Sequence, residues 1–291
     1  MKQNQIKKTI GIFLYVISSL ITITINKYLL SILHLKSQFV FLSIQSFIVS
    51  IIAILFALLN LVKVKNKNII QWVPLSVILT IMIYTSSKTL EYLSISIFTL
   101  LKNFSIILTA LIEWYLYGKL IELQSWVAFL LMFISSYIGE NNEFYINSFG
   151  YFFMSCNIIS TSVYVLFLKH TLDKGVSLAD PVLFCNLLSV PQLLVLSYFF
   201  EDLSFSILDN VQIFLICISG ISVFFTSYTT CYCLSLLSST TLSMLGAINK
   251  LLMSFTGIIF IGEKNVGALK ISSLFLGSLS GFLYSNRIKK E

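Results

Sequence analysis

The sequence predicts an all-α integral membrane protein with ten transmembrane helices. Hydrophobic residues make up 57% of the 291 residues and charged residues only 11%, whereas soluble domains have about 45–50% and about 25%. The mean hydropathy is +0.92. A soluble fold could not bury this much apolar surface, and an intrinsically disordered chain would not contain it. Soluble and disordered classes are therefore excluded.

Apolar runs long enough to cross a bilayer, about 20 residues each, occur along the whole chain. The predicted spans are 10–33, 38–62, 72–91, 95–116, 123–139, 148–168, 181–200, 211–232, 238–261 and 266–286. The fifth span is short and the junction between the eighth and ninth is nearly seamless, so nine spans is the alternative count. The short loops leave no room for a soluble domain, so residues 1–291 form a single membrane domain.

Lysine and arginine are distributed unevenly between the two sides that ten spans would create. One side, which holds both termini, receives 12 of the 19 basic residues: Lys2, Lys7, Lys8, Lys63, Lys65, Lys67, Lys119, Lys169, Lys174, Arg287, Lys289 and Lys290. The opposite side receives only Lys36 and Lys264. Because cytosolic loops carry the excess of basic residues, both termini are predicted to be cytosolic.

The remaining five lysines fall inside predicted spans: Lys27, Lys88, Lys102, Lys250 and Lys270. Lys102 and Lys250 lie too deep to snorkel easily, and a charge at the bilayer centre costs about 2.5–3.5 kcal/mol on insertion scales. The one acid at this depth is Glu113. An excess of ammonium groups in a central cavity indicates a phosphate-bearing ligand. No nucleophile–base pair or metal-ligand spacing accompanies them, so neither an enzyme, nor a cofactor, nor a metal site is predicted. The five cysteines are expected to be buried apolar residues.

A weak internal repeat suggests how the spans are organised. Lys102-Asn103 in the fourth span is echoed by Asn249-Lys250 in the ninth. Two halves of five helices have opposite orientations in the membrane, as in many transporters whose site lies between inverted repeats. Residues 1–139 would form the first half and residues 148–291 the second.

Three motifs in order resemble one family. The run SSTTLSMLGAINK, residues 238–250, resembles the GALNK region of GDP-mannose transporters, which are nucleotide-sugar transporters of the drug/metabolite transporter superfamily. The run LKNFSIIL, residues 101–108, looks like that family's FKNLTIIL motif. Residues 82–93 match its third span, and the resemblance covers nearly the whole chain.

The resemblance implies exchange of cytosolic GDP-mannose for luminal GMP across the Golgi membrane. Lys250 would hold phosphate, Gly246 and Ala247 would let the sugar approach the backbone, and Tyr15 and Ser227 would line the nucleotide pocket. The implied partners are a nucleotide sugar, a nucleoside monophosphate and membrane lipid, without nucleic acid; a homodimer is open. The motifs place substrate-binding residues at Tyr15, Lys102, Asn103, Cys185, Asn186, Ser227, Leu242, Gly246, Ala247, Asn249 and Lys250.

Two positions depart from the family pattern. The family's guanine-reading FYNN motif corresponds to Leu183-Phe184-Cys185-Asn186, and Leu242 replaces a family tyrosine. An asparagine carbonyl accepts a hydrogen bond well, whereas a thiol is a weak acceptor. GDP-fucose, another nucleotide sugar or organic phosphate, and a transport-dead membrane scaffold are therefore the alternatives. The basic tail Arg287–Glu291 also leaves cycling through the endoplasmic reticulum open.

Overall fold

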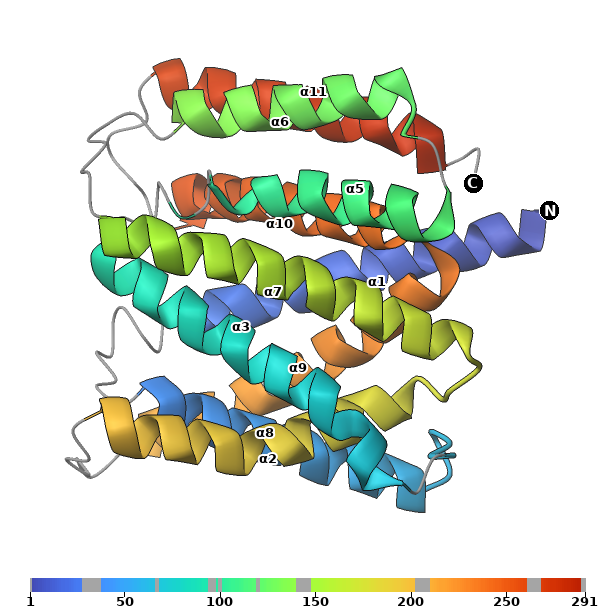
Figure 1. Ribbon diagram of the computed structural model, residues 1–291, viewed down its shortest axis with the longest axis vertical. Coiled ribbons are helices and arrows are strands. Elements are labelled where there is room, and N and C mark those ends of the chain that lie inside the picture. The colour runs from blue at the N-terminus through green and yellow to red at the C-terminus, as the bar shows by residue number, and fades with distance from the viewer. Residues whose placement is uncertain are drawn as a thin grey trace. The chain divides into compact units, whose positions relative to one another are not determined.

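The computed structural model describes residues 2–27, 38–65, 68–93, 98, 101–118, 121–139, 148–201, 210–260 and 268–288. Within these residues the protein is helical and contains no strand, which confirms the predicted all-α class (Figure 1). Each predicted span overlaps a helix of the described residues. The helices are α1 (Lys2–Lys27), α2 (Gln38–Leu58), α3 (Val73–Tyr92), α5 (Phe104–Tyr117), α6 (Leu123–Gly139), α7 (Ser148–Asp173), α8 (Ala179–Phe200), α9 (Asn210–Leu236), α10 (Ser239–Phe260) and α11 (Ala268–Ile288), with a 3-10 turn at Ile69–Trp72.

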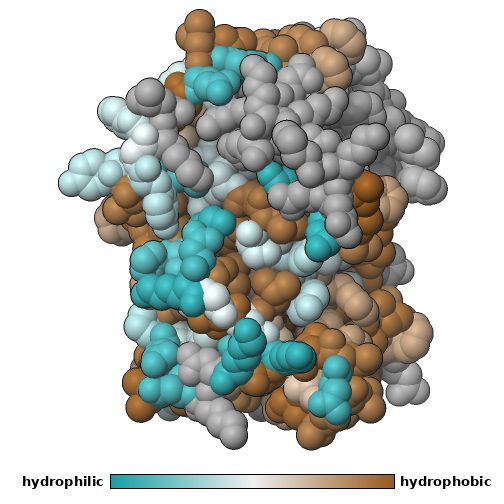
Figure 2. All heavy atoms as spheres, turned by 90° about the vertical axis from the view of Figure 1, so that its right-hand side faces the viewer, coloured by the Kyte–Doolittle hydropathy of each residue, from teal (hydrophilic) through white to brown (hydrophobic). Residues whose placement is uncertain are grey.

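The helices carry apolar side chains on the outside, as lipid-facing helices do. Six of the described helical segments are long and apolar enough to cross a membrane, and shorter apolar helices accompany them. Large residues such as Phe13, Phe152 and Phe282 are more than 60% exposed. On the face shown in Figure 2, hydrophilic side chains gather in groups among apolar ones. The protein is therefore a polytopic membrane protein.

The chain divides into two compact units, each built from segments that are far apart in the sequence. Unit 1 comprises residues 1–5, 81–166 and 237–291, and unit 2 comprises residues 6–80 and 167–236. Helices α1, α3 and α7 contribute to both units, whereas the passage from unit 2 to unit 1 at Leu236–Leu237 coincides with the gap between α9 and α10.

Unit 1 has an apolar core where α5, α6, α10 and α11 pack together. Its members are Ile106, Ala110, Ala128, Phe129, Met132, Met244, Ala247 and Tyr284. Side chain to backbone hydrogen bonds tie α6 to α11: Ser280 donates to the Ala128 carbonyl at 2.7 Å and Ser135 donates to the Ser273 carbonyl at 2.7 Å. Small residues let such helices approach closely. The hydroxyl groups donate to backbone carbonyls, which have no water partner inside the lipid.

Unit 2 contains α2 between α8 and α9, and a half-buried acid joins α8 to α2. Glu201 at the end of α8 accepts the backbone N–H of Phe39 at 2.6 Å, and its other carboxylate oxygen accepts a bond from Ser197 at 2.8 Å. The carboxylate thus caps the N-terminus of α2, where the helix dipole favours a negative charge. Near the other end, Trp72 stacks on Phe184 with ring centroids 6.0 Å apart.

Helices that lie five predicted spans apart pack against one another. These pairs are α2 with α8, α5 with α10, and α6 with α11, and in each the two helices run side by side (Figure 1). Pairing of repeat-equivalent helices is what a two-fold relation between the halves would produce. The inverted repeat itself stays a prediction.

At Gly220, α9 lies close to Ile48 of α2, and a larger residue there should destabilise unit 2. A Cβ at this position would lie 2.5 Å from Ile48 Cγ2 and 2.7 Å from Ile48 Cβ. We expect Gly220→Ala to lower stability by about 1–3 kcal/mol, the usual cost of overpacking. Thermal unfolding in detergent measures the effect, with Ile221→Ala as the control because Ile221 is 45% exposed. An unchanged unfolding temperature for Gly220→Ala would contradict this packing.

Candidate substrate-binding site

The predicted site residues divide between the two units. Unit 1 holds Lys102, Asn103, Leu242, Gly246, Ala247, Asn249 and Lys250, and unit 2 holds Tyr15, Cys185, Asn186 and Ser227.

Lys102 is held by a polar network that joins three spans of unit 1. Its Nζ donates to Asn157 Oδ1 and, at 2.6 Å, to Thr161 Oγ1, both on α7. Asn157 is fully buried, and its Nδ2 donates to the Met82 carbonyl at 2.8 Å and to Thr85 Oγ1 at 3.1 Å, both on α3. The ammonium also lies 5.8 Å from the centre of the Phe98 ring, a distance suited to a cation–π interaction. These partners orient the ammonium, and none of these bonds neutralises its charge.

The fourth predicted span is locally irregular at Asn103. Residues 101–102 are helical, Asn103 forms a turn with right-handed helical backbone angles (φ −65°, ψ −22°), and α5 begins at Phe104 with Asn103 as its N-cap residue. The Ile106 N–H donates to the Asn103 carbonyl at 3.0 Å, which is the spacing of a tighter 3-10 turn, and Ser105 donates to the Lys102 carbonyl at 2.6 Å. Lys102 therefore lies just before the first turn of α5.

Helix α10 carries the predicted binding segment on two different faces. Ser243 and Gly246 are half-buried, and helical periodicity places Lys250 on the same face. The side chain of Lys250 lies outside the described residues. Ala247 is 5% exposed and packs in the core of unit 1. The accessible face of α10 is therefore that of Ser243 and Gly246, while a contact of Ala247 with the sugar stays a prediction. Leu242 is 4% exposed on the adjoining side.

Asn249 carries a buried side-chain amide. It is 1% exposed, and neither Oδ1 nor Nδ2 has a hydrogen-bond partner in the described part of the chain. An unsatisfied buried amide costs about 1–3 kcal/mol, and native proteins retain few such groups. A bound polar ligand or water would remove this cost. Among the predicted site residues in unit 1, Asn249 therefore gives a structural indication of a ligand.

In unit 2, α8 presents Cys185 and Asn186 side by side in the buried first half of the helix. Asn186 Nδ2 donates to the Val182 carbonyl of the preceding turn at 2.7 Å. This bond fixes the amide nitrogen, and Oδ1 is then the group that can accept a hydrogen bond from a ligand. Cys185 is 1% exposed and is a free thiol, so its capacity as an acceptor is weak.

Tyr15 and Ser227 lie half-buried on α1 and α9, which a series of polar side-chain pairs connects. Ser18 Oγ lies 3.0 Å from Thr229 Oγ1, and Thr22 Oγ1 lies 2.8 Å from Thr226 Oγ1. Farther along, Ser219 donates to Asn26 Oδ1 at 2.7 Å, and the side-chain amide nitrogen Nε2 of Gln45 donates to the same oxygen at 3.1 Å. Tyr15 and Ser227 thus belong to helices joined by hydrogen bonds, and their contact with a nucleotide stays a prediction.

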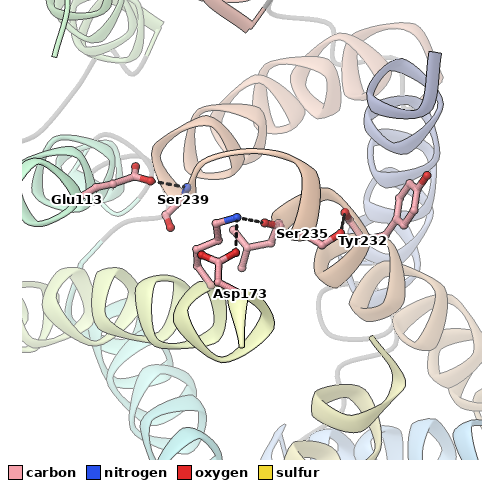
Figure 3. Close-up of polar contacts among 7 residues, drawn as sticks. Glu113, Asp173, Tyr232, Ser235 and Ser239 are labelled. Atoms are coloured by element: carbon pink, nitrogen blue, oxygen red, sulfur yellow. Dashed lines mark hydrogen bonds and ion pairs between the residues drawn. The ribbon is translucent and has the colours of Figure 1, made fainter. Parts of the chain in front are cut away.

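Sequence reasoning missed Asn157 and Thr161, and it gave Glu113 no role. Asn157 and Thr161 lie within a polar stretch of the sixth span, NIISTS, residues 157–162. One asparagine and hydroxyls four residues apart on a transmembrane helix were the available signal. Their partner Lys102 is more than fifty residues away in sequence, so only the fold identifies the network. Glu113 accepts three hydrogen bonds at the start of α10, and these are shown in part in Figure 3.

Comparisons with known proteins agree with the fold and the motifs. No protein-family model matches the chain. A solved crystal structure that is 15% identical has a TM-score of 0.76 over 99% of both chains, which shows a shared fold. The chain is 35% identical to a GDP-mannose transporter of Scheffersomyces stipitis over 95% of its length and 91% of the relative. It is 33% identical to a GDP-mannose transporter of Komagataella pastoris and to GDP-mannose transporter 1 of Saccharomyces cerevisiae, over 97% of its length and 91% of each relative. These relatives are transporters and not enzymes, and the chain belongs to the GDP-mannose transporter family.

Proposed function

We propose that this protein imports GDP-mannose from the cytosol into the Golgi lumen in exchange for GMP, with both termini in the cytosol. The observation that carries the proposal is the similarity to named GDP-mannose transporters over nearly the full chain. The retained motifs at residues 101–108 and 238–250 support it, because they contain the two deep lysines. Excess basic residues in the loops on the side of the termini support the orientation.

The phosphates would be bound by Lys250 and Lys102. An ammonium is a point-charge partner for phosphate and works best where water is scarce. Lys102 is already oriented by Asn157 and Thr161, so little side-chain freedom would be lost when phosphate binds. Asn249 would supply a donor and an acceptor to the same ligand, since both of its amide groups lack a partner within the described residues.

Guanine would be recognised by Asn186. The Watson–Crick edge of guanine carries N–H donors, and Asn186 Oδ1 is free to accept one because Nδ2 is bound to the Val182 carbonyl. Cys185 would contribute shape and little hydrogen bonding. Base discrimination would therefore rest on one strong acceptor.

Exchange of the two nucleotides suits a membrane carrier energetically. Moving one charge across a potential of 100 mV involves about 2.3 kcal/mol. GDP-mannose and GMP carry similar negative charge, so a one-for-one exchange moves little net charge. The pairing of helices five spans apart supports alternating access between two related halves, residues 1–139 and 148–291.

A second candidate is another nucleotide sugar on the same fold, one whose base is not guanine. The observation that favours it is Cys185, which replaces a hydrogen-bonding residue of the family motif with a weak acceptor. Loss of one buried hydrogen bond lowers discrimination by about 1–3 kcal/mol, or roughly tenfold to a hundredfold.

The test is uptake of labelled GDP-mannose into proteoliposomes loaded with GMP, UMP or AMP. We expect rapid uptake with GMP and a much slower rate with the other two. Cys185→Asn should widen the preference for GMP by about tenfold, because it adds a second acceptor, whereas the matched control Cys185→Ala should not. Equal uptake with all three nucleotides would favour the second candidate. Absence of uptake by protein that unfolds cooperatively on heating would contradict transport of GDP-mannose.

A further inference from the structure

We propose that Glu113 is a positioning residue for substrate binding, which fixes the start of α10 and through it the binding face of that helix. The proposal rests on the proposed function, because it assumes that α10 contacts the transported nucleotide sugar. Three hydrogen bonds carry it. One carboxylate oxygen accepts the Ser239 N–H at 3.2 Å (Figure 3). The other accepts the Thr240 N–H at 3.0 Å and the Thr240 hydroxyl at 2.6 Å.

The burial of Glu113 inside a membrane span indicates that its contact with the start of α10 is functional. The residue belongs to α5, is 4% exposed and lies in the otherwise apolar run ALIEWYLY, residues 110–117. Buried acids inside membrane spans are costly and commonly functional. The first N–H groups of a helix have no partner within the helix and carry partial positive charge. The carboxylate satisfies two of them, and the start of α10 compensates the charge of the carboxylate.

The cap lies one turn from the accessible face of α10. Thr240 is followed at helical spacing by Ser243 and Gly246, the half-buried residues, and then by Lys250. Because a helix rises 1.5 Å per residue, the cap and Gly246 are about 9 Å apart along the axis. A rigid helix transmits a tilt or an axial shift at its first turn to all of these positions, so Glu113 sets where they stand.

The start of α10 lies next to the boundary between the two units along the chain, so a contact that fixes it within unit 1 has structural value. The chain enters unit 1 at Leu237, immediately after α9 ends, and Ser238 is the only residue between that point and α10. On the α9 side, Lys169 Nζ donates to the Leu234 carbonyl at 2.9 Å and pairs with Asp173 at 2.9 Å (Figure 3). The end of α9 is thus held within unit 2 by Lys169, and the start of α10 is held within unit 1 by Glu113. Residues at the ends of helices can absorb backbone rotation, and the cap holds the start of α10 within unit 1.

The experiment compares Glu113→Gln and Glu113→Asp with Glu122→Gln. Glu122 is the matched control because it is an exposed glutamate that follows α5. Amide hydrogen exchange over residues 237–245 reports the cap directly, and exchange of GDP-mannose for GMP in proteoliposomes gives KM and the maximal rate. We expect Glu113→Gln to speed hydrogen exchange at Ser239 and Thr240. It should also raise KM about tenfold, the loss expected for one bond to a charged group, with a much smaller change in maximal rate. Glu113→Asp should restore part of both, and Glu122→Gln should change neither.

A role in stability alone would give a different pattern. Glu113→Gln protein with exposed Ser239 and Thr240 amides but unchanged KM would overturn the proposal, as would amides that stay protected. If Glu113→Gln does not fold, Thr240→Val removes the 2.6 Å bond alone and should raise KM in the same direction; an unchanged KM would again overturn the proposal. A wild-type protein without exchange activity would instead overturn the proposed function, so the two failures are distinguishable.

Discussion

Lys250→Gln should reduce exchange of GDP-mannose for GMP by about two orders of magnitude or more. Truncating one partner of a desolvated charge pair costs about 2–5 kcal/mol, because the other charge is left uncompensated. The phosphate of the substrate would be that charge. Glutamine keeps the length and a hydrogen-bond donor while removing the positive charge. The measurement is the initial rate of labelled GDP-mannose uptake into GMP-loaded proteoliposomes.

Two companion variants separate charge from general damage. Lys174→Gln removes an exposed lysine beyond the end of α7 and should leave uptake unchanged. Lys250→Arg keeps the charge but replaces a compact ammonium by a planar fork, so it should retain a measurable part of the activity. Full uptake by Lys250→Gln would show that the ninth span does not bind the phosphate.

The fold followed from the sequence because the membrane imposes it. A run of about 20 apolar residues has few alternatives to a helix in a bilayer, and so the range 181–200 corresponds closely to α8, Ala179–Phe200. Helix ends were less predictable where polar residues have tertiary partners. The sixth span was predicted to end at residue 168, but α7 continues to Asp173 because Lys169 bonds to Leu234 and pairs with Asp173.

The candidate site could be predicted only where its residues are close in sequence. The segment 238–250 is recognisable as a motif, yet its residues alone do not reveal that Ala247 packs in the core while Ser243 and Gly246 are more accessible. Contacts between segments far apart in the sequence could not be predicted. The partners of Lys102 and Glu113 come from spans brought together by packing, and hydropathy carries no information on which spans are neighbours.

The second large effect is expected in the network around Lys102. Two variants of Thr161, Thr161→Asp and Thr161→Asn, differ from each other almost only in charge. Thr161→Asp would place a carboxylate beside Lys102 Nζ, which now lies 2.6 Å from the Thr161 hydroxyl. The asparagine of Thr161→Asn has nearly the same shape as the aspartate and keeps an acceptor oxygen, but it carries no charge. We expect Thr161→Asn to keep most of the exchange activity. Thr161→Asp should lose about tenfold or more, because an internal ion pair would compete with the phosphate for Lys102.

Stability distinguishes this competition from misfolding. Burying an unpaired carboxylate would destabilise the protein strongly, whereas a carboxylate paired with Lys102 is compensated. Thermal unfolding of Thr161→Asp should therefore be close to that of Thr161→Asn, while their uptake rates differ. If both variants transported equally well, the charge of Lys102 would have no part in binding the phosphate, and its hydrogen bonds to α7 would serve only to hold the fourth span against the sixth. A loss confined to Thr161→Asp would place the phosphate beside Lys102, just before the first turn of α5.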